Sequence, residues 1–349
     1  MSRGIATPCA VYVANADTQD ISLFDLGSDG TMSLRSTVVV HRPVHIGRSI
    51  ILALSPDRRF LYAGHLSGPG QASVSAFAID ARTADLEPIG TAPLVDSTAY
   101  LSTDRSGRFL LSASYAGSKV SIHSIGTDGR VGEPLQVIDT EPKAHCILTD
   151  PSNRFVLHTS LGGDLIYQSR FDVRTGVLTP NDPAACKARP KSGPRFIVFA
   201  PNADRVYVIN EFDGAVDVYP FDPAAGTLAP PVQTIGTLPE TFTGQPWGGD
   251  IRFRPDGRFL YVSERTTSMI TAFEVDGRNG RLERIDAYPT VRQPRAFAID
   301  PSGNHLVSAG QLSNTVALYV IDAATGELIR RREHSVGKNP TWVEIVALQ

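Results

Sequence analysis

Cysteine is scarce in this sequence, which contains three of them, Cys9, Cys146 and Cys186. An odd number of cysteines at such wide spacing does not form a disulfide framework. Reduced thiols of this kind are typical of proteins in a reducing compartment, so we expect a cytoplasmic location.

The sequence also lacks long apolar runs and an excess of charge of one sign. No apolar stretch reaches the length of a transmembrane helix, and residues 1–8 do not follow the pattern of a signal peptide. The formal net charge is −3 and the pI is about 6.2, so no basic field indicates binding to nucleic acid. We therefore expect neither a membrane nor a nucleic acid as a partner.

Several signatures of bound groups are missing as well. The sequence has no zinc-type spacing of histidine and cysteine, no G-x-S-x-G elbow, no P-loop and no dinucleotide fingerprint. We predict no cofactor on this basis. No stretch of useful length shows helical periodicity, which favours an all-β chain.

What the sequence does contain is a repeated hairpin. The clearest copy is at residues 195–213, where two apolar β-rich runs flank the turn cluster Pro-Asn-Ala-Asp. The turn recurs at intervals of about 50 residues. Its positions are Pro56, Arg105, Pro151, Pro201, Pro255 and Pro301. A third strand follows most hairpins, at 72–80, 119–125, 215–222, 269–276 and 315–322, and a Gly-rich turn and a fourth strand come next.

Four antiparallel strands per repeat of this length are typical of a β-propeller blade. Residues 10–34 match the second, third and fourth strands of a blade, and residues 340–348 match an isolated first strand. The sequence thus predicts an all-β, seven-bladed β-propeller that is closed by a blade shared between the N- and C-termini. Sharing a blade removes exposed sheet edges. We expect a single domain over residues 1–349.

Hairpin geometry places the residue before the first strand beside the residue after the second. The first set is His45 or Arg48, Tyr100, His145, Arg195, Asp250, Arg295 and Thr341. The second set is Leu66, Tyr115, Leu161, Glu211, Arg265 and Gln311. Polar groups that converge in a cavity mark a binding site, and the basic ones favour an anion as the ligand.

Structural interpretations of the same residues remain open. Arg195, Glu211 and Arg265, taken singly, fit ion pairs that link blades, and Glu264 is an alternative partner for Arg265. Asp250, Glu211 and Glu264 offer oxygens to a divalent cation, but three nearby arginines would repel it, so we predict no metal.

Two neighbouring features bear on the site. Cys146 follows His145 and is expected to point to the other face of the strand, which argues against a nucleophilic cysteine–histidine pair. The basic insertion 184–193 is expected to form a loop over the same mouth, and 238–249 to form a second long loop.

Four segments carry a resemblance to a known family: AHCILTDPSNRFV, GPRFIVFAPNADRVYVINE, RPDGRFLYVSER and SYAGSKVSIHSI. They resemble the seven-bladed lactonase family, which contains propeller-type 6-phosphogluconolactonases and the fungal carboxymuconate lactonizing enzyme. The spacing from Arg195 to Glu211 is the most specific part. The resemblance implies that His145, Arg195, Glu211 and Arg265 form the site. The family usually has Asn where this chain has Glu264.

These observations favour metal-independent hydrolysis of a small anionic sugar lactone, 6-phosphogluconolactone or a related aldonolactone. His145 or Glu211 would act as the general base, and His145 is preferred because an unperturbed histidine titrates near pH 6.5. Arg195 would stabilise the oxyanion. The remaining predicted substrate contacts are Arg265, Arg295, Tyr115, Gln311 and Asp250.

Two alternatives are kept. A carboxymuconate-type cyclase would need the same arginines and would close a lactone instead of opening it. A non-enzymatic propeller scaffold would present an exposed apolar patch on one rim, for which Phe242 and Trp247 are candidates. We expect a monomer or a weak homodimer in each case.

Overall fold

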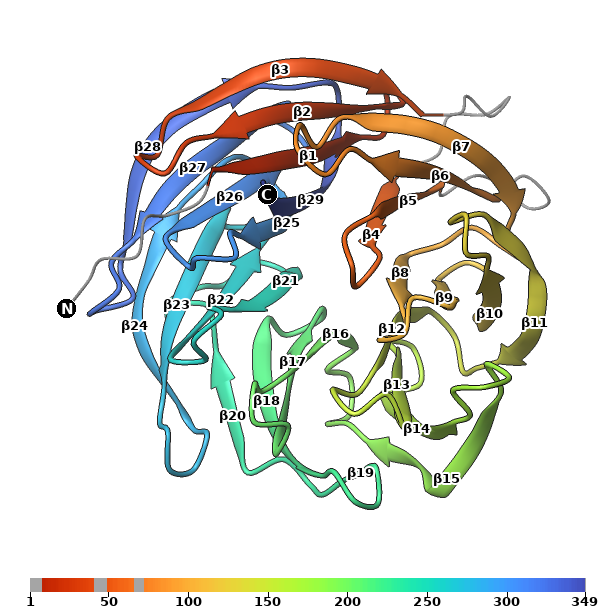
Figure 1. The fold of residues 1–349 in the computed structure, drawn as a ribbon. Helices are drawn as coiled ribbons and strands as arrows, with labels where there is room; N and C mark the ends of the chain where they lie inside the picture. The colour runs from red at the N-terminus through yellow and green to blue at the C-terminus, as the bar shows by residue number, and fades with distance from the viewer. Residues whose placement is uncertain (1–7, 41–48, 66–71, 349) are drawn as a thin grey trace.

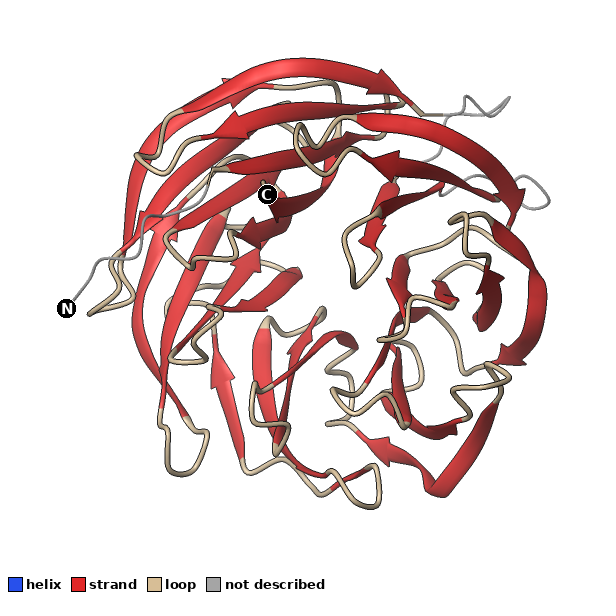
Figure 2. Cartoon of the chain, in the orientation of Figure 1, coloured by secondary structure: helices blue, strands red, loops and turns tan. Residues whose placement is uncertain are grey.

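The computed structural model describes residues 8–40, 49–65 and 72–348, which form seven antiparallel sheets arranged in a ring (Figure 1). All regular elements in these ranges are strands, and Figure 2 shows loops as their only connections. The described chain therefore has no helix that could cross a membrane. The expected seven-bladed β-propeller with four antiparallel strands per blade is confirmed.

The first strand of each blade lies nearest the centre of the ring, and each contacts the first strands of the two neighbouring blades (Figure 1). These inner strands are β4 (Ile50–Leu54), β8 (Tyr100–Thr103), β12 (Ala144–Thr149), β16 (Pro194–Phe199), β21 (Gly248–Phe253), β25 (Pro294–Ile299) and β29 (Pro340–Ala347). The second strands are β5 (Phe60–His65), β9 (Phe109–Ser114), β13 (Phe155–Ser160), β17 (Arg205–Asn210), β22 (Phe259–Glu264), β26 (His305–Gly310) and β1 (Cys9–Asn15).

The third and fourth strands follow toward the outside. The third strands are β6 (Ser73–Ile79), β10 (Lys119–Ile125), β14 (Leu165–Phe171), β18 (Ala215–Asp222), β23 (Met269–Val275), β27 (Thr315–Ile321) and β2 (Asp20–Leu26). The fourth strands are β7 (Leu86–Pro93), β11 (Val131–Asp139), β15 (Leu178–Lys187), β24 (Leu282–Pro289), β28 (Leu328–Ser335) and β3 (Met32–Val39). One blade has its fourth strand split into β19 (Thr227–Leu228) and β20 (Gln233–Gly236), which both pair with β18.

The two ends of the chain meet in one blade, as predicted. Its strand order is β29-β1-β2-β3, with Val11 opposite Ile345 and Val13 opposite Val343. The last strand of the chain is thereby hydrogen-bonded to the first, so the two termini complete one four-stranded blade and close the ring.

Burial falls from the centre of the ring to its outside. All six residues of β9, β13, β22 and β26 are buried, whereas most of β28 is exposed. The second strands read as continuous apolar runs because both of their faces are covered by neighbouring blades.

Neighbouring blades interlock through aromatic rings and glycines. A Cβ atom on Gly226 would lie 2.1 Å from the ring of Phe155 in the preceding blade, and one on Gly176 would lie 2.6 Å from Phe109. Both glycines have positive φ, 72° and 77°. The turn between the third and fourth strands therefore needs glycine both for its backbone and for close approach of the next blade.

The basic insertion 184–193 differs from the expected loop. Its first part belongs to β15, where Ala185 pairs with Tyr167 and Cys186 with Ile166. Arg189 then forms ion pairs with Asp213 and Asp217, at 2.7 and 2.9 Å. The prediction of one loop over residues 184–193 was wrong because strand pairing continues past the apolar part of β15.

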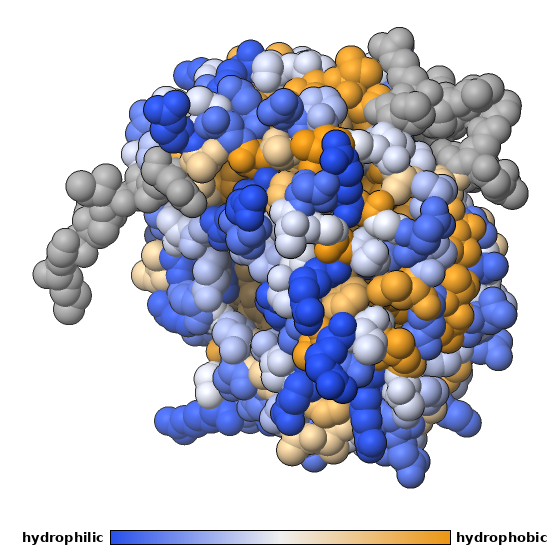
Figure 3. All heavy atoms as spheres, turned by 45° about the vertical axis from the view of Figure 1, so that its right-hand side comes forward, coloured by the Kyte–Doolittle hydropathy of each residue, from blue (hydrophilic) through white to orange (hydrophobic). Residues whose placement is uncertain are grey.

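Hydrophilic and hydrophobic residues are mixed over the face that Figure 3 shows. The exposed large hydrophobic residues belong to many different elements, for example Leu34 on β3, Val137 on β11 and Ile329 on β28. Single exposed apolar side chains are normal on a protein surface. Of the two residues named for the scaffold alternative, Trp247 is 36% exposed.

We expect His158 to make folding stability depend on pH. Its ring stacks on Tyr167 at 4.5 Å, neither nitrogen has a hydrogen-bond partner among the described residues, and burial lowers its pKa to about 3. The unfolded chain therefore binds more protons than the folded one between pH 6.5 and 3, so stability is lost as the pH falls through this range. From pH 7 to pH 5 this group should remove about 2 kcal/mol from the free energy of unfolding.

Urea unfolding of the parent and of His158→Phe at pH 7 and pH 5 measures this contribution to the free energy of unfolding. The variant should lose about 2 kcal/mol less than the parent on acidification. Equal losses in the two proteins would show that His158 is protonated in the folded state or contributes nothing.

Candidate active site

Irregular strand pairing aims polar side chains at one end of the central axis. In β16 the register with β17 shifts between Pro194 and Phe196, which makes Arg195 an extra residue on the inner strand. The same shift occurs at the matching place in β12, β21, β25 and β29. Such bulges break the alternation of side chains and re-aim a residue, often beside an active site. We call this end of the axis the basic mouth, because Arg195, Arg265 and Arg295 meet there.

Residues with left-handed backbone join the two sets of predicted site residues. Gly193 and Gln293 have φ of 67° and 59°. The carbonyl of Gly193 accepts a hydrogen bond from the N–H of Glu211 at 2.8 Å, and that of Gln293 from the N–H of Gln311 at 3.1 Å. The start of an inner strand is thus tied to the end of the second strand, so both sets lie at the same mouth, as the hairpin argument predicts.

Arg195 and Glu211 form a buried ion pair. Nε of Arg195 donates to Oε2 of Glu211 at 3.0 Å, and the two side chains are 0% and 13% exposed. Nη1 of Arg195 donates to the carbonyl of Gly249 in the next blade. Nη2 is buried and has no hydrogen-bond partner in the described chain. One amino group of Arg195 is therefore available to an oxygen atom of a ligand.

Arg265 is held between an aromatic ring and an amide. Its guanidinium carbon lies 3.4 Å from the ring centroid of Trp247, and its Nη2 donates to Oε1 of Gln311 at 2.6 Å. Gln311 is fixed in turn, because its Oε1 also accepts from Gln293 at 3.1 Å and its Nε2 donates to Asn339 at 2.9 Å. The amide of Gln311 thus positions Arg265, whose Nε is buried and has no partner in the part of the chain that the structure describes.

The three arginines at this mouth repel one another. Burial and the charges of Arg295 and Arg195 hold the pKa of Arg265 well below its ordinary value. Burial and the charge of Arg195 lower the pKa of Arg295 to about 9, and Nε of Arg295 is also buried with no partner within the described ranges. Within the described residues, Glu211 alone forms an ion pair with a member of this cluster. The cluster carries excess positive charge, and a bound anion would relieve the repulsion.

His145 lies beside this cluster and is neutral. Its side chain is buried, with ring centroids 6.0 Å from Tyr115 and 5.1 Å from Phe196. Burial, and then the charges of Arg195 and Arg295, hold the pKa of His145 well below its ordinary value. The sequence favoured His145 as the general base because an unperturbed histidine has a pKa near 6.5. The lowered pKa of His145 removes this reason.

Lys143 also lies at the basic mouth, although its sequence context does not single it out. Its Nζ is 5.8 Å from the ring centroid of Tyr115 and 5.3 Å from that of Phe212. Lys143 has a φ of 67° and stands two residues before His145, as Gly193 stands two residues before Arg195. Alignment of the repeats at this turn is the signal that would have found it.

The register of β21 places Asp250 one residue further along its inner strand than the hairpin argument predicts. Because Ile251 pairs with Val262 across the same bulge, the residue level with Arg195 is Gly249. The carboxylate of Asp250 accepts hydrogen bonds from the backbone N–H groups of Ile251 at 2.8 Å and Phe297 at 3.3 Å and from Nε of Arg252 at 3.3 Å. These contacts favour electrostatic support of the arginines, and substrate contact by Asp250 stays a prediction.

Glu264 acts on Arg265 indirectly. One carboxylate oxygen accepts the backbone N–H of Trp247 at 2.6 Å, and the other accepts the N–H and hydroxyl of Thr267, both at 2.6 Å. No ion pair joins Glu264 to Arg265. The acidic residue at this position instead holds the loop that stacks Trp247 on Arg265.

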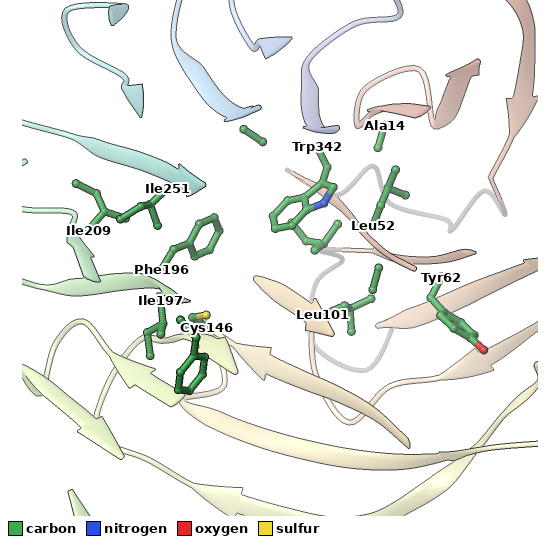
Figure 4. Close-up of a cluster of buried hydrophobic side chains, with 14 of the residues drawn as sticks. Ala14, Leu52, Tyr62, Leu101, Cys146, Phe196, Ile197, Ile209, Ile251 and Trp342 are labelled. Atoms are coloured by element: carbon green, nitrogen blue, oxygen red, sulfur yellow. The ribbon is translucent and has the colours of Figure 1, made fainter. Parts of the chain in front are cut away.

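Three aromatic rings lie behind the basic mouth. Tyr100, Phe196 and Trp342 contact one another edge to face, with centroids 5.0 to 5.7 Å apart. Figure 4 shows Phe196 and Trp342 reaching toward each other from different strands. The guanidinium carbon of Arg195 lies 4.1 Å from the ring centroid of Phe196. We call these three rings the aromatic floor, because the predicted site stands on one side of it.

Cys146 is excluded as a nucleophile, but not for the predicted reason. The bulge in β12 interrupts the alternation on which that reason rested. The thiol is fully buried, and burial raises its pKa to about 12, which keeps it protonated.

The remaining predicted positions have other roles or lie outside the described residues. The hydroxyl of Thr341 is buried and bonds to the backbone of Ile50, at 3.1 and 2.8 Å, and Leu161 is buried. His45, Arg48 and Leu66 lie outside the described ranges.

Known proteins are similar to this chain over almost its whole length. Residues 10–345 match the family model described as lactonase, 7-bladed beta-propeller. The chain belongs to this lactonase family. It is 39% identical over 339 residues to a Pectobacterium carotovorum protein named 6-phosphogluconolactonase, with 97% of this chain and 98% of the relative covered. A 6-phosphogluconolactonase of Serratia proteamaculans is 38% identical over 337 residues, with coverage of 97% and 98%.

Solved structures agree with this family assignment. A Bacteroides fragilis crystal structure has a TM-score of 0.88 at 27% identity and covers 99% of this lactonase-family chain and 100% of its own. The Pseudomonas aeruginosa periplasmic gluconolactonase has a TM-score of 0.89 at 23% identity, with coverage of 98% and 100%. At 23% identity, the comparison with the Pseudomonas aeruginosa protein shows a common fold only.

The environment of His145 predicts its titration directly. Because burial and two positive charges lower its pKa, the ring should stay neutral from pH 8 to pH 5.5, where an ordinary histidine gains a proton near pH 6.5. Histidine ring resonances followed by NMR, with His145→Gln to assign the signal, measure this. A midpoint near pH 6.5 for His145 would contradict the described electrostatics.

Proposed function

We propose that this protein hydrolyses the lactone of a phosphorylated sugar acid, with 6-phosphogluconolactone as the substrate. The observation that carries the proposal is the basic mouth, where three buried or half-buried arginines lie together and, among the described residues, only Arg195 has an ion pair, with Glu211. Such a cluster suits a substrate that has a phosphate and develops an oxyanion. The names of full-length relatives at 38–39% identity support the same substrate.

In the proposed reaction a water molecule attacks the lactone carbonyl. Glu211 takes the proton of the water, because its carboxylate is partly exposed at the mouth and Arg195 holds it in place. Nη2 of Arg195 donates to the oxyanion of the tetrahedral intermediate. The ester C–O bond then breaks, and Glu211 gives the proton to the ring oxygen, which becomes a hydroxyl group. The neutral ring of His145 would hydrogen-bond to the reacting oxygens.

Arg265 and Arg295 would bind the phosphate. Each has a buried, unpartnered Nε, and together they offer a dianion two planar donor groups. Tyr115 and Gln311 would line this part of the site. The proposed reaction uses no metal, because the guanidinium groups around the substrate would repel a divalent cation.

We also propose a cytoplasmic location and a monomer or weak homodimer. The sequence has only three cysteines, Cys9, Cys146 and Cys186, at wide spacing, which suits a reducing compartment. Exposed outer strands such as β28 are rich in charge, which suits a surface facing water.

The test is an assay of the purified protein on three compounds. We expect rapid hydrolysis of 6-phosphogluconolactone and a kcat/KM for unphosphorylated gluconolactone that is lower by about 10²-fold, because the phosphate contacts are lost. A carboxymuconate should not react. Cyclisation of the carboxymuconate without hydrolysis of either lactone would replace the proposal with the cyclase alternative.

A further inference from the structure

Two adjoining cavities lie between the aromatic floor and the turns that join first and second strands. Each has a volume of about 330 Å³. They share the lining residues Tyr100, Arg105, Leu148 and Arg252, so we call them together the turn-side cavity. Neither is lined by His145, Arg195, Glu211 or Arg265. Its size is at the lower end of the range for small-molecule sites.

Arg105 is the exceptional residue of the repeated turn. The corresponding position is proline in the other five copies, at Pro56, Pro151, Pro201, Pro255 and Pro301. The backbone N–H of Arg105 donates to Asn153 at 2.9 Å, but its guanidinium has no hydrogen bond or ion pair with the described residues. The neighbouring Arg108, in contrast, donates to Ser106 and to the carbonyl of Val173. Turn formation therefore explains the arginine at 108 but not the one at 105.

Arg252 supplies a second guanidinium to the same cavity. Its Nε bonds to Asp250 at 3.3 Å, and its two terminal amino groups make no hydrogen bond within the described chain. The residues at its level on five other inner strands are small or uncharged: Ala53, Ser102, Leu148, Val198 and Ala298. A charge at this level is thus confined to Arg252 and to Glu344 on β29.

Glu344 attracts Arg252 electrostatically but forms no ion pair with it. One of its oxygens accepts the indole N–H of Trp342 at 2.8 Å, and no ion pair joins Glu344 to Arg252. Glu344 also lines the cavity, together with Arg105 and Arg252, and so offers an acceptor for hydroxyl groups. Tyr100, Leu148 and Trp342 supply apolar surface between them.

We propose that the turn-side cavity is a second binding site, which takes a small carboxylate or phosphate that also bears hydroxyl groups. The anion binds between the guanidinium groups of Arg105 and Arg252, and a hydroxyl group donates to Glu344. The aromatic floor separates this ligand from the basic mouth. The site rests on Arg105, Arg252 and the cavity, and it does not depend on the reaction proposed for the other side.

Crystals soaked in selenate locate anions directly by anomalous scattering. We expect one peak at the basic mouth and another between Arg105 and Arg252. In Arg105→Gln, which keeps the backbone N–H for Asn153, the second peak should vanish and the first should remain. Arg108→Gln removes the same charge from the same turn and should keep both peaks. A wild-type crystal without the second peak, or an Arg105→Gln crystal that retains it, would overturn the proposal.

Equilibrium dialysis with labelled phosphate gives the same comparison in solution. The Arg295→Met variant, which lacks a proposed phosphate contact at the basic mouth, should still bind phosphate, and adding Arg105→Gln to it should weaken that binding by about tenfold or more, the effect of losing a charged hydrogen bond. Adding Arg108→Gln instead should change the affinity less than twofold. Equal effects of the two substitutions would show general charge attraction and would overturn the site, whereas the lactonase assay alone decides the reaction.

Discussion

Replacing Arg195 with alanine is expected to lower kcat by about 10²–10³, the usual cost of losing one oxyanion donor. The reason is Nη2 of Arg195, which has no partner in the described chain and is the proposed oxyanion donor. The effect should fall on kcat more than on KM, because the oxyanion exists only after water attacks. Steady-state kinetics on 6-phosphogluconolactone measure it.

A control is needed because Arg195 also pairs with Glu211. Arg205→Ala removes an arginine from the other end of the same hairpin, where it contacts Asp204, and should leave kcat within about twofold. Urea unfolding of Arg195→Ala should show a cooperative transition like that of the parent. Activity within a few-fold of the parent would refute the proposed role of Arg195.

Replacing Arg295 with methionine should stabilise the fold while it impairs the enzyme. The pKa of Arg295 is lowered to about 9 by burial and by Arg195, so its charge is unfavourable in the folded protein without a ligand. Removing it should raise the free energy of unfolding by about 1–2 kcal/mol. The same change should lower kcat/KM by about 10²-fold, mainly through KM, because a phosphate contact is lost.

Arg292→Met, an exposed arginine three residues earlier in the chain, is the matched control. It should change stability by less than about 0.5 kcal/mol and leave KM unchanged. The two Arg295→Met effects are measured by urea unfolding and by steady-state kinetics. A destabilised Arg295→Met would mean that the three arginines do not repel one another as described.

The repeat predicted the fold because the strands of each blade, apart from the shared one, follow one another directly in the sequence. Apolar runs and turn residues recur with a fixed order, and residues 340–348 could only complete the blade begun at Cys9. The same hairpin geometry predicted that Arg195 and Glu211 would meet. It could not predict bulges, which insert one residue without a sequence signal, and so it placed Asp250 level with Arg195 when Gly249 holds that position.

Contacts made by loops and by distant blades were not predictable in the same way. The stacking of Trp247 on Arg265 depends on Glu264, which binds the loop from the end of β22. The low pKa of His145 arises from arginines far away in the sequence. Burial and charge of this kind are properties of the assembled ring, which a local pattern does not contain.

A crystal structure with bound 6-phosphogluconate, the product of the proposed reaction, tests the central claim most directly. The account predicts the phosphate on Arg265 and Arg295, and the new carboxylate against Nη2 of Arg195 and beside Glu211. Product bound only beyond the aromatic floor, or bound at the basic mouth without contact to these arginines, would contradict it.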